Sequence, residues 1–211
     1  SMNVLCSDKT GTLTANQMTV EAVAARTEAD GGELVECAVF ATRGESFDPM
    51  DRAVRQYAGR VRPEAAGLQT GWRLLREYPL TPGLFAVTEV WERELSGLRK
   101  IAAKGAPEAI ASLCHLGAAE TAELLERVAK FSAEGLRVLG VARGAWKKEE
   151  LPQEQHDFDF EYVGLIAFVD PVRTSVAAAA RECREAGIRV VMITGDYAGT
   201  ALSVARKVGL N

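Results

Sequence analysis

The first indication of the fold of this 211-residue chain comes from one stretch near its start, Asn3-Val4-Leu5-Cys6-Ser7-Asp8-Lys9-Thr10-Gly11-Thr12. Its first five residues form a short, mostly apolar run, and the polar residues from Asp8 onward, which include a glycine, end that run. The pattern predicts a buried β-strand that delivers the Asp8 carboxylate into a loop.

A second boundary of this kind lies near the other end of the chain. We expect a helix over 174–186, closed by Gly187, and then a β-branched strand over 188–193 that ends at Thr194-Gly195-Asp196. Strand, polar loop, helix and strand in this order are typical of a parallel α/β sheet, whose active sites lie at the carboxyl ends of the strands. Both polar loops lie at such ends.

The region between the two boundaries has an α+β pattern. We expect helices over 49–58, 107–114 and 119–133, and strands over 85–91, 100–104 and 136–142, with a turn at Ser96-Gly97 in the hairpin. The simplest arrangement is therefore an α/β sheet, built by 1–20 and 170–211, that is split by an inserted α+β module over 21–169.

Composition excludes several classes of protein. Hydrophobic residues make up 47% and charged residues 26% of the chain, which is the balance of a globular domain. The net charge of −4 has the wrong sign for a nucleic-acid partner. No apolar stretch is long enough to cross a bilayer, so we expect a soluble polypeptide. The four cysteines have neither zinc nor disulfide spacing, which favours a reducing, cytosolic setting.

The chemistry that these residues can support is phosphoryl transfer. The chain has neither a GxxxxGK[ST] loop nor a GxGxxG turn. Asp8 offers a nucleophilic carboxylate, Thr10 and Thr194 offer hydroxyl donors, and Gly195 keeps the approach open. Attack on a phosphoryl group also needs charge neutralisation, usually by Mg²⁺, for which Asp8 is a candidate ligand. Taken alone, the Asp8–Thr12 string fits a polar surface turn equally well.

The rest of the chain resolves this choice through a resemblance. The motifs occur in the order seen in the cytosolic part of P-type cation-transporting ATPases, which belong to the haloacid dehalogenase superfamily: SDKTGTLT (7–14), KGAPE (104–108), GLR (135–137), DPVR (170–173) and MITGD (192–196). The resemblance spans essentially the whole chain. It implies a truncated Rossmann-like phosphorylation domain (1–20 and 170–211) and an inserted α+β nucleotide-binding domain (21–169) with an antiparallel sheet and flanking helices.

The resemblance also implies roles for individual residues. Asp8 would be phosphorylated by ATP, Lys9 would lie in the same catalytic loop, and Thr10 would contact Mg²⁺ and phosphate. Thr194 and Gly195 would hold the phosphoryl group, and Asp196 would face the nucleotide or the hinge. In the inserted domain, Lys104 and Gly105 of KGAPE would line the adenine pocket, Arg137 would reach the phosphates, and Asp51 would stand near the adenine. Asp170 and Arg173 resemble a hinge pair that meets ribose and phosphate. The expected metal ligands are Asp8 and Thr10.

Two alternatives stay open at this point. Related phosphatases carry a second aspartate two residues after the nucleophile as general acid and base, but this chain has Thr10 there, which favours a pump over a soluble phosphatase. A nucleotide-binding module without catalysis is the other alternative. The chain ends at Asn211, before the family's later lysine and magnesium loop, so we expect this piece to bind ATP without turnover.

The resemblance has further consequences for partners and for the adenine pocket. A transported cation would be a partner only of a longer parent, at the cytosolic face of a membrane. The family's adenine-stacking aromatic and a nearby lysine are replaced by Leu80 and Phe85, and Tyr78 or Phe85 are candidates to compensate.

Overall fold

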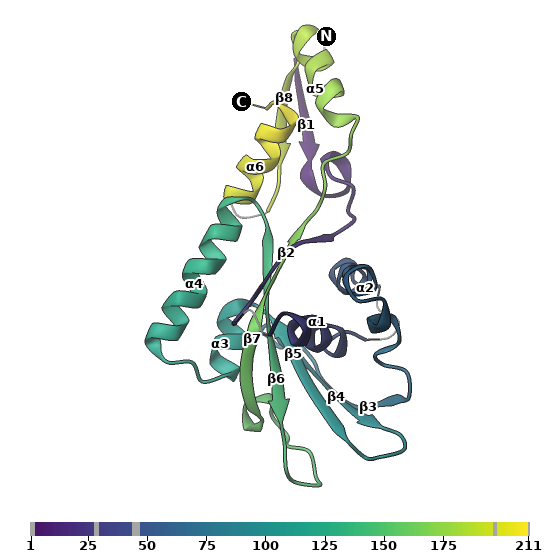
Figure 1. Cartoon of the computed structure of the whole chain (residues 1–211). Coiled ribbons are helices and arrows are strands. Elements are labelled where there is room, and N and C mark those ends of the chain that lie inside the picture. Colours follow the sequence, from purple (N-terminus) through teal and green to yellow (C-terminus); the bar gives the residue numbers. More distant parts are fainter. Residues whose placement is uncertain (1–2, 28–29, 44–46, 196–197, 211) are drawn as a thin grey trace.

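The computed structural model describes residues 3–27, 30–43, 47–195 and 198–210, and it places them in two lobes (Figure 1). The small lobe holds two parallel strands, a tight turn and two helices: β1 (Val4–Asp8), η1 (Lys9–Leu13), α5 (Val176–Glu185), β8 (Arg189–Ile193) and α6 (Ala198–Val208). The other elements form the large lobe.

A six-stranded antiparallel sheet is the centre of the large lobe. Its strand order is β2-β7-β6-β5-β4-β3, with bounds Thr19–Ala25 (β2), Trp72–Tyr78 (β3), Ala86–Arg93 (β4), Arg99–Gly105 (β5), Arg137–Ala145 (β6) and Asp159–Val169 (β7). The chain enters this sheet through β2 and leaves it through the neighbouring β7, so both connections to the small lobe lie side by side.

Helices cover both faces of this sheet (Figure 1). One face packs against α1 (Gly31–Phe40) and α2 (Pro49–Val61), with Phe40 and Trp91 in the shared core. The other face packs against α3 (Pro107–Leu113) and α4 (Ala118–Ala133), and the helical turns η3 (Pro63–Gly67) and η4 (Gln155–Asp157) lie in the connections. Burial of these apolar side chains stabilises the lobe because about 25 cal/mol is gained per Å² removed from water.

The fold class expected from the sequence is confirmed, since the chain has an antiparallel sheet with flanking helices and a parallel strand pair. The Ser96-Gly97 turn is confirmed too: Gly97 has φ +66°, and its N–H donates to Arg93 O at 3.0 Å. Helix α2 begins where Asp48 Oδ1 accepts a hydrogen bond from Met50 N at 2.7 Å. The domain boundaries near residues 20 and 170 stay a prediction.

The prediction of a buried first strand is wrong. The side chain of Val4 is 49% exposed, and Ile193, at the end of the partner strand, is 58% exposed. Strand β1 pairs with β8 in a two-stranded sheet, which gives these apolar side chains little to pack against within the described residues.

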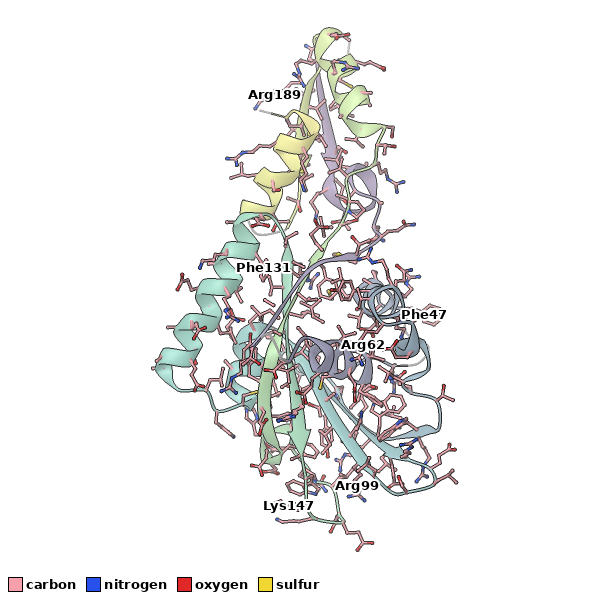
Figure 2. All side chains as sticks on the ribbon, viewed as in Figure 1. Phe47, Arg62, Arg99, Phe131, Lys147 and Arg189 are labelled. Carbon is pink, nitrogen blue, oxygen red and sulfur yellow. The ribbon has the colours of Figure 1, made fainter. Side chains whose placement is uncertain are left out.

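The far end of the large lobe, opposite the small lobe, is marked by Arg99 and Lys147 in Figure 2. There the Arg99 guanidinium donates to the carbonyls of Lys148 and Glu149 at 3.0 and 2.9 Å.

In the part of the chain that the structure describes, none of the helices has the length and apolarity that a bilayer crossing requires.

Candidate functional site

The two polar loops singled out in the sequence lie side by side. Strands β1 and β8 run parallel with Asp8 opposite Ile193, so Thr194 and Gly195 follow directly beside Asp8. The Asp8 side chain is exposed, whereas Thr194 is half-buried. This arrangement confirms the expectation that both loops meet at the carboxyl edge of a parallel sheet, the usual place for an active site in such folds.

The turn after Asp8 depends on its glycine. Gly11 has φ +77°, a left-handed conformation that residues with a Cβ adopt at a cost. The turn is closed by Thr14, whose N–H donates to Lys9 O at 3.0 Å. Lys9 itself is only 5% exposed. The turn that follows Asp8 is therefore closed by a backbone hydrogen bond and buried at Lys9.

The residues of the DPVR motif hold this loop in place. Asp170 Oδ2 accepts a hydrogen bond from the Thr14 hydroxyl at 2.5 Å, and Thr14 is fully buried. The Arg173 guanidinium donates to Thr14 O at 3.0 Å and to Gly11 O at 2.8 Å. Asp170 and Arg173 thus join the two connections between the lobes. Their expected contacts with ribose and phosphate stay a prediction.

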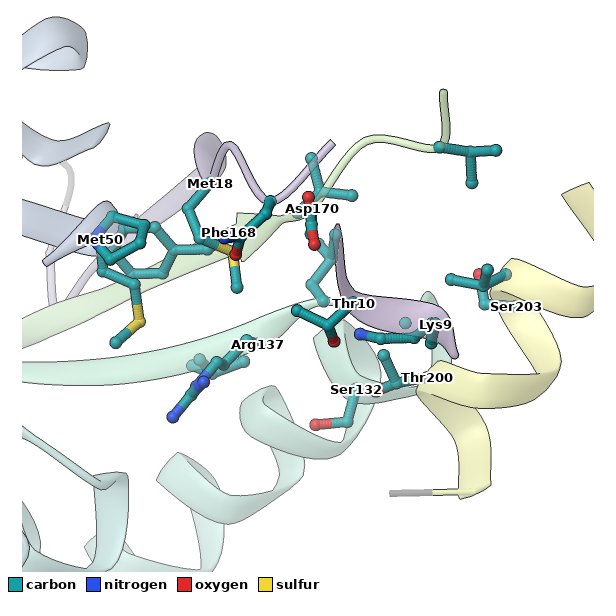
Figure 3. A pocket seen from close by; sticks show the side chains of 18 of the residues that line it. Lys9, Thr10, Met18, Met50, Ser132, Arg137, Phe168, Asp170, Thr200 and Ser203 are labelled. Carbon is teal, nitrogen blue, oxygen red and sulfur yellow. The ribbon is translucent and has the colours of Figure 1, made fainter. Parts of the chain in front are cut away.

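A cleft of about 650 Å³ lies between the lobes, next to this loop (Figure 3). Its polar side presents Lys9 and Thr10 from the small lobe and Arg137 from the large lobe, and its apolar wall is built by Met18, Met50 and Phe168. Asp170 and Gly195 also line it. The structure therefore brings together predicted site residues that are far apart in sequence.

The lobes touch at the rim of the cleft. Helix α6 of the small lobe meets the end of α4, where the Ser203 hydroxyl donates to Glu134 O at 3.2 Å. Gly135 follows with φ +82°, and a Cβ there would lie 2.6 Å from Ser203 Cβ. Glycine at position 135 can adopt the left-handed conformation that ends helix α4, and it leaves room for the close contact with Ser203. Strand β6, which carries Arg137, begins two residues later.

Lys104 and Asp51 lie outside this cleft and bind each other. They form an ion pair between β5 and α2, and both side chains are about one-seventh exposed, at 13% and 14%. The Lys104 ammonium also donates to Thr42 Oγ1 at 2.8 Å. The structure thus confirms neither residue as an adenine contact, but it places them together, as the resemblance implies.

Gly105 has a packing role that the sequence did not reveal. It pairs with Ala86 in β4 and with Gly140 in β6. A Cβ at Gly105 would lie 2.3 Å from Phe85 O and 2.5 Å from Ala86 Cα, both of which are backbone atoms. Only glycine fits there without displacing the main chain.

Tyr78 is not available to stack on an adenine, so that expectation is wrong. Its side chain is 5% exposed, packs edge-to-face on Phe158 at a 5.3 Å centroid distance, and donates to Pro152 O at 2.6 Å. It belongs to the sheet face opposite to the one that carries Lys104, because neighbouring positions along a strand point to opposite faces. Phe85 is 56% exposed.

The donors at the loop fit Mg²⁺ better than a metal that needs a protein cage. Asp8 supplies one exposed carboxylate near Thr10, and no cluster of three or more His, Cys, Asp or Glu side chains suited to a metal occurs among residues 3–195 and 198–210 as far as they are described. Mg²⁺ accepts such a set because it keeps several waters and takes oxygens from phosphates. Asp196 lies outside the described residues.

Sequence reasoning missed the apolar wall of the cleft and one buried acid. Met18, Met50 and Phe168 are ordinary apolar residues at the ends of elements, and nothing in their spacing distinguishes them from core. Glu89, which is 2% exposed, could have been noticed as a charge within the otherwise uncharged run from Leu84 to Trp91.

The comparisons with known proteins agree with this geometry. The family of haloacid dehalogenase-like hydrolases matches residues 2–211, and the chain belongs to this family. It is similar to the plasma membrane ATPase of Zygosaccharomyces rouxii (32% identity, 99% of this chain, 22% of that protein) and to plasma membrane ATPase 1 of Saccharomyces cerevisiae (32%, 99% and 22%).

A third relative is a sodium/potassium exporting P-type ATPase of Schizosaccharomyces pombe, with 32% identity over 77% of this chain and 17% of that protein. The chain spans less than a quarter of the length of these three relatives.

Proposed function

We propose that this chain is the ATP-binding part of a P-type cation-transporting ATPase and that Asp8 accepts the γ-phosphoryl group. The observation that carries this proposal is the cleft of about 650 Å³ that places Lys9 and Thr10 opposite Arg137. The kinship with plasma membrane and cation-exporting ATPases supports it. The longer protein would be an integral membrane protein, with this part on the cytosolic side.

In this proposal the nucleotide enters the cleft with its phosphates at the polar side. Lys9 and Arg137 contribute positive charge, and the Thr10 and Thr194 hydroxyls donate hydrogen bonds to phosphate oxygens. Mg²⁺, held by Asp8 and Thr10 together with phosphate oxygens, would neutralise charge on the transferring group. The cation transported by the longer protein is a partner of its other segments.

Asp8 then acts as nucleophile. One carboxylate oxygen forms a bond to the γ-phosphorus, the bond from that phosphorus to the β,γ-bridging oxygen breaks, and ADP leaves with the bond's electron pair. Thr10 stands where a general base would activate water, and a hydroxyl cannot take up the proton at neutral pH. The aspartyl phosphate therefore persists.

A soluble phosphatase is the second candidate, and it would hydrolyse a generic phosphate ester.

Nucleotide binding tests the cleft. Titration with ATP should shift the amide NMR signals of residues around Arg137, and Arg137→Ala should weaken binding about tenfold, because a hydrogen bond to a charged group contributes about 1.5–3 kcal/mol. Arg143→Ala is the matched control: Arg143 lies on the same strand but pairs with Glu33 and Glu161, away from the cleft. Equal losses in both variants would contradict the site.

Phosphorylation tests the nucleophile. In the longer protein, Mg·ATP labelled at the γ-phosphate should leave acid-stable, hydroxylamine-sensitive label, and Asp8→Asn should abolish it, since an amide is too weak a nucleophile. Asp159→Asn, at the start of β7, is the control and should label normally. Label on the Asp8→Asn protein would exclude Asp8, and rapid turnover of p-nitrophenyl phosphate by the chain would favour the phosphatase.

A further inference from the structure

Two hydroxyl-bearing side chains of the cleft are not used by the proposed mechanism. Ser132 lies near the end of α4 in the large lobe, and Thr200 lies in the first turn of α6 in the small lobe. Both side chains line the cleft of about 650 Å³, and both are half-buried. Polar side chains that two lobes present to one cavity are candidates for binding the ligand of that cavity.

Gly135 fixes how close these two residues lie to each other. Its N–H donates to Ser132 O at 2.9 Å, which places Ser132 in the turn that ends α4. On its other side, a Cβ at Gly135 would lie 3.7 Å from Thr200 Cα and 2.6 Å from Ser203 Cβ. The missing side chain therefore lets α6 approach the end of α4, and Ser132 and Thr200 flank the contact between the lobes.

Neither hydroxyl is committed to another group of the protein. Within the described residues, the side chains of Ser132 and Thr200 form no hydrogen bond, whereas the nearby Ser203 hydroxyl donates to Glu134 O at 3.2 Å. A helical serine or threonine often donates to the carbonyl of the preceding turn, but neither of these two described residues does so. Both donors are therefore available to a ligand in the cleft.

The surroundings of the pair are suited to a phosphate group. Lys9 and Thr10 of the small lobe lie at the same end of the cleft as Ser132 and Thr200, and Arg137 lies further along it (Figure 3). This end offers three hydroxyl donors and an ammonium group next to the loop that follows β1. The outer oxygens of a terminal phosphate are all acceptors, so donors on several sides match such a group.

We propose that Ser132 and Thr200 bind the terminal phosphate of a nucleoside triphosphate, one from each lobe, and make the cleft selective for a triphosphate over a diphosphate. This inference rests on the proposed nucleotide binding. A diphosphate bound along the rest of the cleft has no group at this end, so both hydroxyls stay with water. A triphosphate replaces that water with charge-assisted hydrogen bonds, which are stronger than neutral ones.

The pair also links the terminal phosphate to the contact between the lobes. One phosphate reaches both hydroxyls only while the end of α4 and the start of α6 are in contact. A ligand favours the arrangement that it binds more tightly. The triphosphate therefore stabilises the contact of Gly135 with Ser203, and a diphosphate, which lacks the group held from both sides, stabilises it less.

Calorimetric titration with ATP and with ADP, at equal Mg²⁺ concentration, tests the selectivity. Thr200→Val and Ser132→Ala remove one hydroxyl each. Each variant should bind ATP about tenfold more weakly than the wild type, at the lower end of what a hydrogen bond to a charged group contributes, and should bind ADP within about twofold of it. The preference for ATP over ADP should fall in both variants by the same factor.

The double variant tests whether the two hydroxyls hold the same group. If one phosphate spans α4 and α6, loss of either contact weakens the other. The double variant should then lose less affinity for ATP than the product of the two single losses. Losses that multiply would overturn the shared phosphate, and so would single variants that lose ATP and ADP affinity equally.

Thr121→Val is the matched control. Thr121 also belongs to α4, but it lies near the other end of this helix, and its hydroxyl donates to Leu116 O at 3.4 Å. This variant should bind both nucleotides like the wild type. Unchanged ATP affinity in Thr200→Val and Ser132→Ala would overturn their role while leaving nucleotide binding intact. A wild-type protein that binds no ATP would instead contradict the proposed function, and with it this inference.

Discussion

Replacing Gly105 by alanine should destabilise the protein by about 3 kcal/mol, the cost of overpacking at a site that cannot relax easily. The new Cβ would lie 2.3 Å from Phe85 O and 2.5 Å from Ala86 Cα. Both are main-chain atoms at the start of the adjacent strand, so the strand itself must move. Urea unfolding followed by circular dichroism measures the effect.

Gly59→Ala is the matched control for this substitution. Gly59 lies inside α2, and a Cβ at that position meets nothing within 4 Å. Alanine there should stabilise the protein by about 1 kcal/mol, because glycine in a helix loses more backbone freedom on folding. If both variants changed stability equally, close packing at Gly105 would be contradicted.

Replacing Glu89 by glutamine should stabilise the protein by about 3 kcal/mol at pH 8.5 and by little at pH 5. Burial raises the pKa of Glu89 from its ordinary value of 4.5 to about 7 in the folded protein, and each unit of difference corresponds to about 1.4 kcal/mol. Glutamine keeps an oxygen that can accept the hydrogen bond that the Trp91 indole N–H donates to Glu89 at 3.1 Å, and it carries no charge to bury.

The direction follows from proton counting. Between pH 4.5 and 7 the folded state binds the Glu89 proton more tightly than the unfolded state, so wild-type stability falls as pH rises through this range. The glutamine variant lacks this term. Urea unfolding of both proteins at several pH values gives the difference, and two parallel curves would show that Glu89 ionises normally.

Local sequence signals predicted some elements well, because the information for them is local. The hairpin around Gly97 and the start of α2 after Asp48 depend on turn and capping residues a few positions apart. Strands β2, β3 and β7 and helices α1 and α6 were not predicted. Strand β7 mixes an alternating segment with a continuous apolar run, so its period alone does not distinguish a strand from a helix.

The candidate site was predictable only in part. The loop at Asp8 and its neighbour at Thr194 could be paired from the sequence, since parallel strands bring their carboxyl ends to one edge. The apolar wall with Met18 and Phe168, and the contact of Ser203 with Glu134, depend on how two lobes lie against each other. Such contacts join residues far apart in sequence, and no local pattern encodes them.

The pairing of β2 with β7 also has a use in protein engineering. Thr19 lies opposite Val169, so the two cut points that would release the large lobe are neighbours in space. Segments with adjacent ends are readily grafted into a surface loop of an unrelated host. The large lobe, cut at Thr19 and Val169 and inserted into a surface loop of a fluorescent protein, would link any ligand-induced change in its sheet to the chromophore. It would then serve as the sensing element of a genetically encoded reporter.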